Sequence, residues 1–384
     1  MNTTCEWKEY ELGELLSYEQ PTPYIVSSTD YNEKYKTPVL TAGKTFILGY
    51  TNETQGVYTA LPVIIFDDFT TASQYVNFEF KVKSSAMKIL TPNTELVLPK
   101  FIYYRMQIIQ FDHSTHKRYW IQQYSKIKVS IPPIPVQEQI VARIEELFSE
   151  LDNGVETLRK IKQQLAVYRQ AVLKSAFGEI SSDEYKPLKS VLSVSPQNGI
   201  YKPKTAYGSG TQILRIDGFY DGRILKDYEF KRLKLSECEI EQYQLNKWDL
   251  VINRVNSMPY LGKCALVRDL AEVTVYESNM MRMRLDDTKV DPEYVTHYLS
   301  SFIGRKELTK NAKQAVNQAS INQTDVGNAL IPVPERLEEQ RNVAFAINAR
   351  MSVCDNIEKT VDTALLQAEA MRQSILKQAF EGSL

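Results

Sequence analysis

Two long amphipathic stretches dominate the pattern of hydrophobic and polar positions along this chain. In the first, apolar residues recur in steps of three and four from Ile140 to Ala176, and the stretch from Val343 to Ala379 repeats this less strictly. Such spacing predicts two long helices, each with one apolar seam of the coiled-coil type. Pro135 suits the start of the first helix and Gly178 its end. About forty residues at 1.5 Å per residue would make a rod of roughly 60 Å.

The ends of these two stretches carry the same sequence. Residues 169–177 read RQAVLKSAF and residues 372–380 read RQSILKQAF, so six of the nine positions are identical. Upstream of each stretch lies a proline-rich strand end that finishes in Glu-Gln, at 138–139 and at 339–340. A period near 200 residues is too long for a solenoid. The repeat therefore predicts two half-molecules in tandem, each a globular part followed by a long helix. Because a globular part separates the helices, we expect them to pair antiparallel. A simple dimerisation stalk is the alternative.

The two intervening stretches are rich in β-branched and aromatic residues and in turn residues, without a βαβ rhythm. We predict an α/β (α+β) chain with mixed sheets, related by a pseudo-twofold repeat. The predicted domains are a first globular domain at 1–133, a helical spacer at 134–180, a second globular domain at 181–333 and a second helical spacer at 334–384.

Composition narrows the class of protein without identifying it. The 384 residues are 43% hydrophobic and 24% charged, which is ordinary for a globular protein of two or three domains. The chain has no apolar run of membrane-spanning length and begins with a polar, acidic segment, so we expect a cytoplasmic protein without a signal peptide. The four cysteines are scattered without a CxxC, which argues against a zinc site.

Charge gives only a weak signal. The net charge is −1, with the globular stretches summing to +2 and the helical ones to −3. This is the direction expected of a DNA-binding protein, but the difference is too small to decide the matter.

Several short motifs resemble catalytic signatures but lack essential parts. Residues 42–45 (AGKT) resemble the end of a phosphate-binding loop without its glycine-rich start, and residues 208–210 (GSG) lack the strand and helix of a cofactor loop. Residues 257–260 (SMPY) differ from the motif that holds a target adenine. Asp67 or Asp68 with Glu79 and Lys81 could form a nuclease centre, but the second half has no counterpart.

The whole chain resembles the specificity (S) subunit of type I restriction-modification systems, the HsdS family. The resemblance lies in the double repeat of a proline-rich strand end and a heptad helix ending in RQxxLKxAF. It extends to INRVNS…YLGK at 252–263, ESNMMRMR at 277–284 and AVNQASINQTD at 315–325, and in the first half to TAGK at 41–44 and IIFDDFTT at 64–71.

This resemblance implies a non-catalytic subunit with two target recognition domains, each reading half of a split, asymmetric double-stranded DNA site. It implies a helical spacer that scaffolds two methylation (M) subunits and, in the full complex, two restriction (R) subunits. S-adenosylmethionine, ATP and Mg²⁺ would be used by those partners, with no cofactor or metal on this chain. A spacer is also expected physically, because two readers must be held about one DNA turn apart or a multiple of it.

Candidate contact residues follow from their chemistry and their place in loops. The predicted DNA-binding residues are Lys44, Thr45, Thr70, Lys81, Lys117, Arg118, Lys202, Lys204, Arg254, Asn256, Lys263, Asn317, Gln318 and Asn322. The repeat segments 169–177 and 372–380 share identical polar residues, which an apolar seam does not require. This repetition predicts equivalent docking sites for two identical subunits. The predicted partner-docking residues are Arg169, Gln170, Lys174, Phe177, Arg372, Gln373, Lys377 and Phe380.

Two other classes of function stay open at this point. A stand-alone nuclease or methyltransferase would show cofactor-dependent activity in the purified chain. A coiled-coil adaptor that binds only proteins would show no sequence-specific binding of DNA when combined with a methylation subunit.

Overall fold

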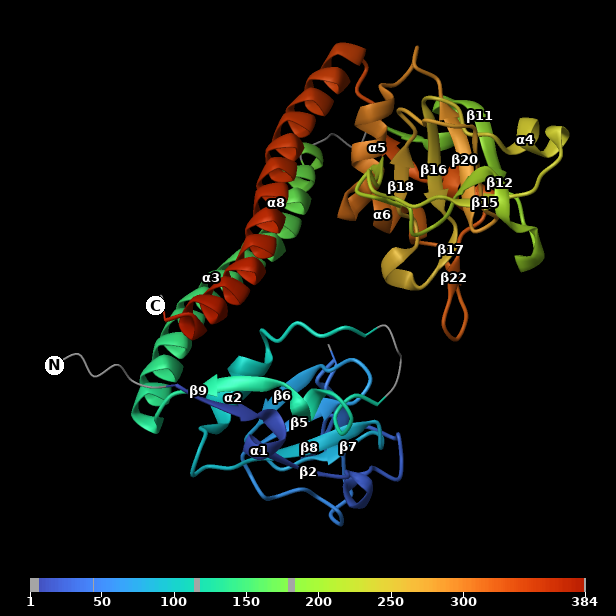
Figure 1. Cartoon of the computed structure of the whole chain (residues 1–384). Coiled ribbons are helices and arrows are strands. Elements are labelled where there is room, and N and C mark those ends of the chain that lie inside the picture. The colour runs from blue at the N-terminus through green and yellow to red at the C-terminus, as the bar shows by residue number, and fades with distance from the viewer. Residues whose placement is uncertain (1–6, 44, 114–117, 179–183, 383–384) are drawn as a thin grey trace. The chain divides into compact units, whose positions relative to one another are not determined.

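The computed structural model describes residues 7–43, 45–113, 118–178 and 184–382 (Figure 1). Among these residues no helix has the length and apolar character needed to cross a membrane.

The chain forms two compact units, and each unit is built from separate stretches of sequence. Unit 1 comprises Met1–Leu158 and Asp362–Leu384, and unit 2 comprises Arg159–Val361. The long helices α3 (Ile134–Phe177) and α8 (Leu337–Phe380) therefore each contribute to both units. Each unit combines a globular part with one segment of either helix, a division that differs from the four consecutive domains expected from the sequence.

Unit 1 is built around a four-stranded sheet with the strand order β2-β8-β5-β6 and a three-stranded sheet with the order β4-β3-β7. A third pair, β1-β9, closes the globular part by joining its first strand to its last. The elements are β1 (Lys8–Glu11), α1 (Leu12–Leu15), β2 (Leu16–Glu19), η1 (Thr22–Tyr24), β3 (Thr37–Leu40), β4 (Ile47–Thr51), β5 (Val63–Asp67), β6 (Ser73–Val76), β7 (Lys81–Val82), β8 (Met87–Pro92), α2 (Pro99–Met106), η2 (Tyr124–Lys126) and β9 (Lys128–Ile131).

Unit 2 repeats this architecture, with a four-stranded sheet ordered β11-β20-β16-β18, a three-stranded sheet ordered β15-β12-β19 and a closing pair β10-β23. Its elements are β10 (Tyr185–Pro187), η4 (Leu188–Val191), β11 (Leu192–Asn198), η5 (Lys204–Ala206), β12 (Tyr207–Leu214), β13 (Phe219–Tyr220), β14 (Arg223–Ile224), β15 (Lys231–Leu233), α4 (Glu237–Tyr243), β16 (Asp249–Asn253), β17 (Val255–Asn256), η6 (Met258–Tyr260), β18 (Cys264–Leu266), β19 (Thr274–Tyr276), β20 (Met280–Leu285), α5 (Pro292–Ser300), α6 (Phe302–Thr309), β21 (Lys313–Gln314), β22 (Ala319–Ser320), α7 (Gln323–Gly327) and β23 (Leu330–Pro332).

The two units correspond strand by strand in the four-stranded sheet, the three-stranded sheet and the closing pair, whereas among the described residues the pair β13-β14 occurs only in unit 2. Each three-stranded sheet has one antiparallel pair and one parallel pair, β3 with β7 in unit 1 and β12 with β19 in unit 2. Unit 2 also has a further sheet, ordered β17-β22-β21, beyond those it shares with unit 1. The predicted α/β class with mixed sheets and a tandem repeat is confirmed.

The central strand of each main sheet is apolar on both faces, so each unit buries two layers of side chains. Ile64 and Phe66 of β5 pack towards α2, whereas Val63 and Ile65 pack towards the three-stranded sheet. In the same way, β16 divides its side chains between the helix-covered core of unit 2 and a second core beneath β12 and β19. Because both faces of these strands are buried, their sequences are short continuous runs of apolar residues.

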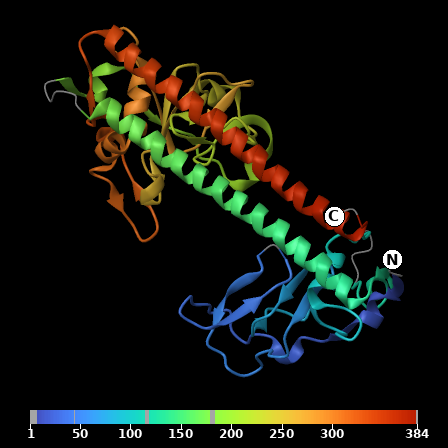
Figure 2. The ribbon, with the colours of Figure 1, turned by 90° about the vertical axis from the view of Figure 1, so that its left-hand side faces the viewer.

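Both helices are 44 residues long, as the two apolar seams predicted, and α3 ends at Phe177, one residue before Gly178 (Figure 2). Leu165, Cys354 and Val361 are buried on the predicted seams. The spacing of apolar residues also predicted Tyr168 on the seam of the first helix, but Tyr168 is 49% exposed, so that prediction is wrong. The seam continues through Val172, as the spacing predicted, and also includes its neighbour Leu173, and both residues are buried.

Candidate nucleic-acid interface

The repeat segment 372–380 at the end of α8 packs on the globular part of unit 1. The ring of Phe380 lies edge-on to Phe101 of α2, with the ring centroids 5.2 Å apart, and the guanidinium of Arg105 lies 5.5 Å from the Phe380 ring centroid. Leu376 and Ala379 are buried against Ile144 and Phe148 of α3. The end of α8 thus joins α2 and α3 in one apolar cluster.

The repeat segment 169–177 at the end of α3 packs on unit 2 in the same way. Phe177 is 1% exposed, and its ring lies edge-on to Tyr294 and Tyr298 of α5, at centroid distances of 5.3 and 5.4 Å. It shares the main core of unit 2 with Ala344 and Ile347 of α8. Both repeat segments therefore end in a phenylalanine packed against a helix of a globular part, α2 or α5.

Ion pairs between the two helices also correspond. In unit 1 Arg372 of α8 binds Asp152 of α3. In unit 2 Arg169 of α3 binds Asp355 of α8, at 2.8 Å. The offset of 203 residues between Arg169 and Arg372 also separates Asp152 from Asp355. The two helices thus run antiparallel within each unit, in equivalent registers.

Unit 2 adds partners to this ion pair. Arg169 also contacts Glu358 at 2.8 Å, and Arg223 of β14 binds the same Asp355 from the globular part. The side chain of Arg169 is 11% exposed, against 31% for Arg372.

A buried glutamine anchors the start of each long helix to the helix of the adjacent globular part. Gln137 accepts a hydrogen bond from the Leu98 N–H at 2.8 Å, and Gln340 accepts one from the Asp291 N–H at 2.9 Å. Leu98 and Asp291 are the N-cap residues of α2 and α5. Both glutamines are fully buried, and each also donates to a backbone carbonyl, of Pro132 and of Pro334 respectively.

These contacts give the repeated residues a role within the chain. Phe177 is buried in its own chain, so its prediction as a partner-docking residue is wrong. Arg169 and Arg372 are held in ion pairs between the helices, Phe380 is half-buried and Gln170 is half-buried. Partner docking stays a prediction for the exposed members of the two segments, Lys174, Gln373 and Lys377.

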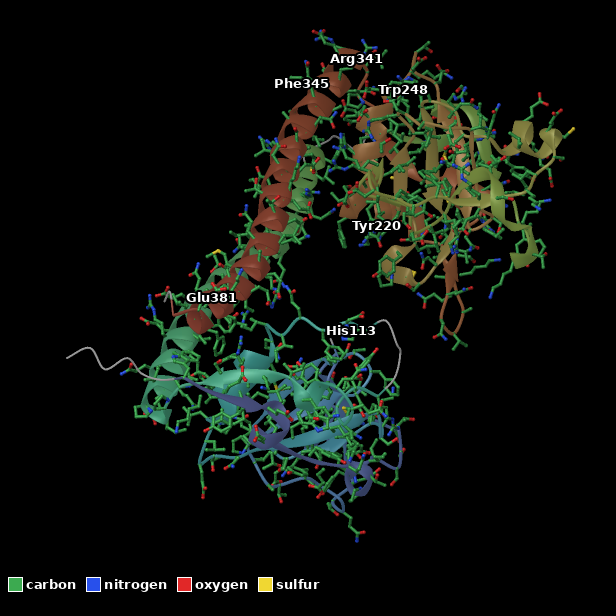
Figure 3. All side chains as sticks on the ribbon, viewed as in Figure 1. His113, Tyr220, Trp248, Arg341, Phe345 and Glu381 are labelled. Carbon is green, nitrogen blue, oxygen red and sulfur yellow. The ribbon has the colours of Figure 1, made fainter. Side chains whose placement is uncertain are left out.

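In unit 2 a lysine lies between two half-exposed tyrosines. The ammonium of Lys263 lies 3.1 Å from the ring centroid of Tyr220, a residue labelled in Figure 3, and 4.2 Å from that of Tyr260. Partial burial lowers the pKa of Lys263 to about 8, and the positive charge of Arg305 adds to this effect. A nearby phosphate would favour the charged form and raise that pKa. The site therefore suits a phosphate contact.

Gly262 is needed to place this lysine. Its φ is +73°, and a Cβ there would lie 3.0 Å from Cγ2 of Thr309 and 3.4 Å from Cγ of Arg305. The glycine lets the chain turn closely over α6 before β18 begins. Sequence reasoning selected Lys263 but missed Tyr220, because only the fold brings β13 beside the loop at 258–263.

Other predicted residues of unit 2 have side chains already used within the unit. Arg254 donates to the Ser278 carbonyl at 3.1 Å, and Lys202 pairs with Glu239 at 2.6 Å. Asn256 accepts from the Ser257 N–H at 2.8 Å. The side chain of Asn322 caps α7 by accepting a hydrogen bond from the Asp325 N–H at 2.9 Å. The Asp325 carboxylate in turn accepts one from the Asn322 N–H. DNA contact by these residues stays a prediction that would need their present bonds to be shared or broken.

Three predicted residues of unit 2 are exposed with uncommitted side chains. Lys204 lies in the short helix η5, and Asn317 and Gln318 lie at the tip of the β21–β22 hairpin. Among the described residues, neither amide side chain of the hairpin tip is hydrogen-bonded within the chain. Val316, beside them, is 99% exposed. Sequence reasoning missed Val316.

In unit 1 the structure removes one predicted contact. Lys81 is 3% exposed, and its ammonium donates to the Gln55 carbonyl at 2.6 Å and pairs with Glu53 at 3.0 Å. Its prediction as a DNA-binding residue is wrong, because a buried, paired ammonium anchors the loop at 53–55. Lys44 and Lys117 lie outside the described residues. Thr45 is exposed next to Lys44, and its carbonyl accepts from the Thr41 hydroxyl.

The loop after β5 gathers the remaining candidates of unit 1. Thr70 is exposed, its N–H donates to Asp67, and its carbonyl lies 2.9 Å from Nε2 of His113 (Figure 3). Arg118 is exposed, and its guanidinium lies 5.9 Å from the ring centroid of Phe69, which is itself 43% exposed. Phe69 links this loop to Arg118, and sequence reasoning missed it.

Asp67 and Asp68, two of the acidic residues considered for a nuclease centre, have structural partners. Asp68 is buried, pairs with Lys88 at 3.3 Å and accepts from the Trp120 N–H at 2.8 Å. In the part of the chain that the structure describes, no cluster of three or more His, Cys, Asp or Glu residues could hold a metal ion. Asp68 thus organises the loops of unit 1.

Comparison with known proteins places this arrangement in a family. Residues 5–166 match the model of the type I restriction modification DNA specificity domain. The specificity subunit of the Escherichia coli restriction enzymes EcoR124I and EcoR124II is 34% identical over 355 residues, covering 88% of this chain and 85% of that protein. The StySPI specificity subunit of Salmonella potsdam is 26% identical, covering 77% of this chain and 66% of that one.

A solved structure supports the fold over the whole chain. A chain from a study of complex assembly and conformational transition of the type I R-M system superposes with a TM-score of 0.68, at 16% identity, and the match covers 98% of both chains. The likeness in fold extends to both units and both long helices. With a relative 34% identical over most of its length, this chain belongs to the family of type I restriction enzyme specificity subunits.

Proposed function

We propose that the two globular parts are target recognition domains that each read one half of a split, asymmetric DNA site. The observation that carries this proposal is the equivalence of the two units, which share one strand order and the same contacts with α3 and α8. Two readers of the same construction, with different surface loops, suit a site whose two halves differ in sequence. The helices would act as the spacer that sets the distance between the two half-sites.

The chain itself would carry no catalytic step. Adenine methylation with S-adenosylmethionine, and cleavage driven by ATP with Mg²⁺, would belong to methylation and restriction subunits that assemble on this chain. In support of a scaffolding role, α8 exposes Phe345 at 76% and Val353 at 58%, and Figure 3 shows Phe345 beside Arg341 near the start of that helix. Apolar side chains of this size on a long helix are suited to covering by another protein.

Methylome sequencing of a host with and without this gene tests the proposal. Methylated adenine at one split, asymmetric motif should disappear with the gene. An unchanged methylome, in a host that expresses the methylation subunit, would favour the coiled-coil adaptor. Cofactor-dependent cleavage or methylation by the purified chain alone would favour the stand-alone enzyme.

Variants of the two units would test the division into half-sites. Arg118→Ala in unit 1 should relax or weaken recognition of one half of the motif and leave the other half unchanged. Lys263→Ala in unit 2 should weaken binding across sequences, because a phosphate contact carries no base information. A variant of one unit that altered both halves of the motif would contradict separate reading.

A further inference from the structure

The β21–β22 hairpin is the most prominent surface feature of unit 2 that the framework shared with unit 1 does not explain. It extends beyond the sheets of the unit (Figure 1). The N–H of Ala315 donates to the Gln318 carbonyl at 2.7 Å, which places Val316 and Asn317 at the tip. The shared framework does not explain why an apolar residue, Val316, is 99% exposed here.

The hairpin is held firmly at its base. Ser320 and Ala319 pair with Val255 and Asn256 of β17, and Ala319 is 3% exposed. The next residue, Ile321, is 1% exposed and donates its N–H to the Arg254 carbonyl at 3.0 Å. The tip is thus an exposed group of side chains on an anchored β-ribbon, a construction that suits recognition of a fixed surface.

We propose that this hairpin enters the major groove of the half-site read by unit 2 and recognises an A·T base pair there. This inference rests on the proposed DNA-reading function. The amides of Asn317 and Gln318 would bind the N6 and N7 edge of adenine, and Val316 would contact the C5-methyl group of thymine. The major groove, about 12 Å wide, admits a two-stranded ribbon, whereas the minor groove, about 6 Å wide, does not without deformation.

The chemistry of the tip selects the base pair. Guanine is typically read by arginine or lysine, and cytosine by a carboxylate, and residues 315–318 (AVNQ) contain neither. An amide N–H can donate to N7 of either purine, but the amide oxygen needs a donor, and only adenine presents one beside N7, at N6. A valine methyl adds contact only where thymine presents its own methyl group. The tip therefore carries the set of groups that an A·T pair complements.

The test uses the full chain assembled with its methylation subunits and the DNA motif found by methylome sequencing. At each adenine of the half-site, 7-deazaadenine removes N7, and at each thymine, uracil removes the methyl group. At one position the wild type should bind the 7-deazaadenine DNA roughly tenfold more weakly. Asn317→Ala or Gln318→Ala should bind unmodified DNA more weakly by a similar factor and lose most of that sensitivity. Val316→Ala should lose the sensitivity to uracil.

Matched controls are available on other surfaces of the same unit. Gln242→Ala on α4 removes an exposed amide, and Val273→Ala removes a valine that is 55% exposed. Both should keep the wild-type response to every modified DNA. Since the three tip side chains are exposed, their variants should fold, and hydrogen exchange of β16 and β20 checks this.

Three outcomes separate the possible failures. Tip variants that keep wild-type affinity and wild-type sensitivity would overturn the role of the hairpin while leaving the DNA-reading function intact. Tip variants that lose the methylation subunits but still discriminate the modified DNAs would show a protein contact instead, which also overturns it. A wild-type complex without sequence-specific binding would overturn the proposed function itself.

Discussion

Unit 1 and unit 2 share the same arrangement of strands, but they differ in the segments that come after the central strands β5 and β16. The residue after β5 is Asp68, and the residue after β16 is Arg254. The Asp68 N–H donates to the Ala86 carbonyl and the Arg254 N–H to the Asn279 carbonyl, at 3.0 and 2.8 Å. The two backbones therefore follow the same path, although the side chains have opposite charges.

The same two residues also anchor the next variable segment. The carbonyl of Asp68 accepts from the Tyr119 N–H at 2.9 Å, and the carbonyl of Arg254 accepts from the Ile321 N–H at 3.0 Å. Unit 1 places the segment around His113 and Arg118 before this anchor, and unit 2 places the β21–β22 hairpin there. Backbone bonds hold the framework while the side chains and loops differ, so one scaffold can present two different surfaces.

The contacts between each globular part and the helix ends are the places where this comparison is easiest to break. Phe177→Ala should destabilise unit 2 by about 3–5 kcal/mol, because it leaves a cavity in a closed core. Phe380→Ala should cost unit 1 less, because Phe380 is only partly buried. Hydrogen exchange followed separately in α5 and α2 measures the two effects. Equal losses in both units would show that burial at these two positions does not set their contribution.

Removing the arginine of the helix–helix ion pair should also destabilise unit 2 more than unit 1. Arg169→Ala leaves Asp355 and Glu358 without their shared partner and should cost about 2 kcal/mol in unit 2. Arg372→Ala removes a more exposed pair and should cost unit 1 at most about 1 kcal/mol. Denaturant unfolding at low and high salt provides the measurement. The Arg372 pair should lose more of its effect in salt, and the reverse order would contradict the assignment of the buried pair to unit 2.

The buried glutamines should behave more alike. Gln137→Ala and Gln340→Ala each leave a helix N-cap N–H and a proline carbonyl without their partner, at a cost of about 1–3 kcal/mol. Gln137 makes a further bond to the Leu96 carbonyl at 3.0 Å, so its loss should be the larger. Thermal unfolding of the single variants checks this. Gln139→Ala, on an exposed position of α3, is the control and should be nearly neutral.

A histidine in unit 2 gives that unit a pH dependence of its own. Burial lowers the pKa of His297, while Asn348 and Glu293 partly oppose this and Arg268 adds to it. Between the folded and the unfolded pKa the unfolded chain binds more protons, so stability is lost as pH falls below about 6.5. His297→Tyr should reduce that loss, and melting curves from pH 7 to pH 5 test it. An identical pH response in wild type and variant would remove His297 as the cause.

Exchanging the repeat segments should have the smallest effect. The segments differ at three positions, paired as Ala171 with Ser374, Val172 with Ile375 and Ser175 with Gln378. Val172 is 4% exposed, so isoleucine there adds one methylene to a packed core and should cost about 1 kcal/mol. The other exchanges lie on exposed positions and should be nearly neutral. A loss as large as that of Phe177→Ala would show that each segment fits only its own unit.

Much of the framework could be read from the chain because its signals are local and periodic. The heptad pattern predicted two long helices, and the repeat predicted two equivalent halves. The register of the repeat was less accurate. The Glu-Gln pairs at 138–139 and 339–340 suggested one alignment, whereas hydrogen bonding makes Gln137 the equivalent of Gln340. Gln137 and Gln139, two positions apart, look alike in sequence, and only burial distinguishes them.

The candidate contacts were harder to predict because each depends on what surrounds the side chain. Lys81 and Lys263 are both lysines next to apolar strands. The ammonium of Lys81 is buried and paired with Glu53, whereas that of Lys263 lies between two tyrosines at the surface. Residue type and the neighbouring sequence do not separate these cases, since the partners come from distant parts of the chain.

The sequence by itself determined the number of halves, the length of the helices and the family, because periodicity and repetition are properties of neighbouring residues. Only the tertiary structure decided that each compact unit takes segments from both helices, and that Phe177 and Phe380 close the cores of units 2 and 1. An apolar seam specifies that a partner is needed but leaves the identity of that partner open. Packing of the aromatic rings, pairing of Asp152 and Asp355 with the repeated arginines, and burial of two glutamines supply that choice.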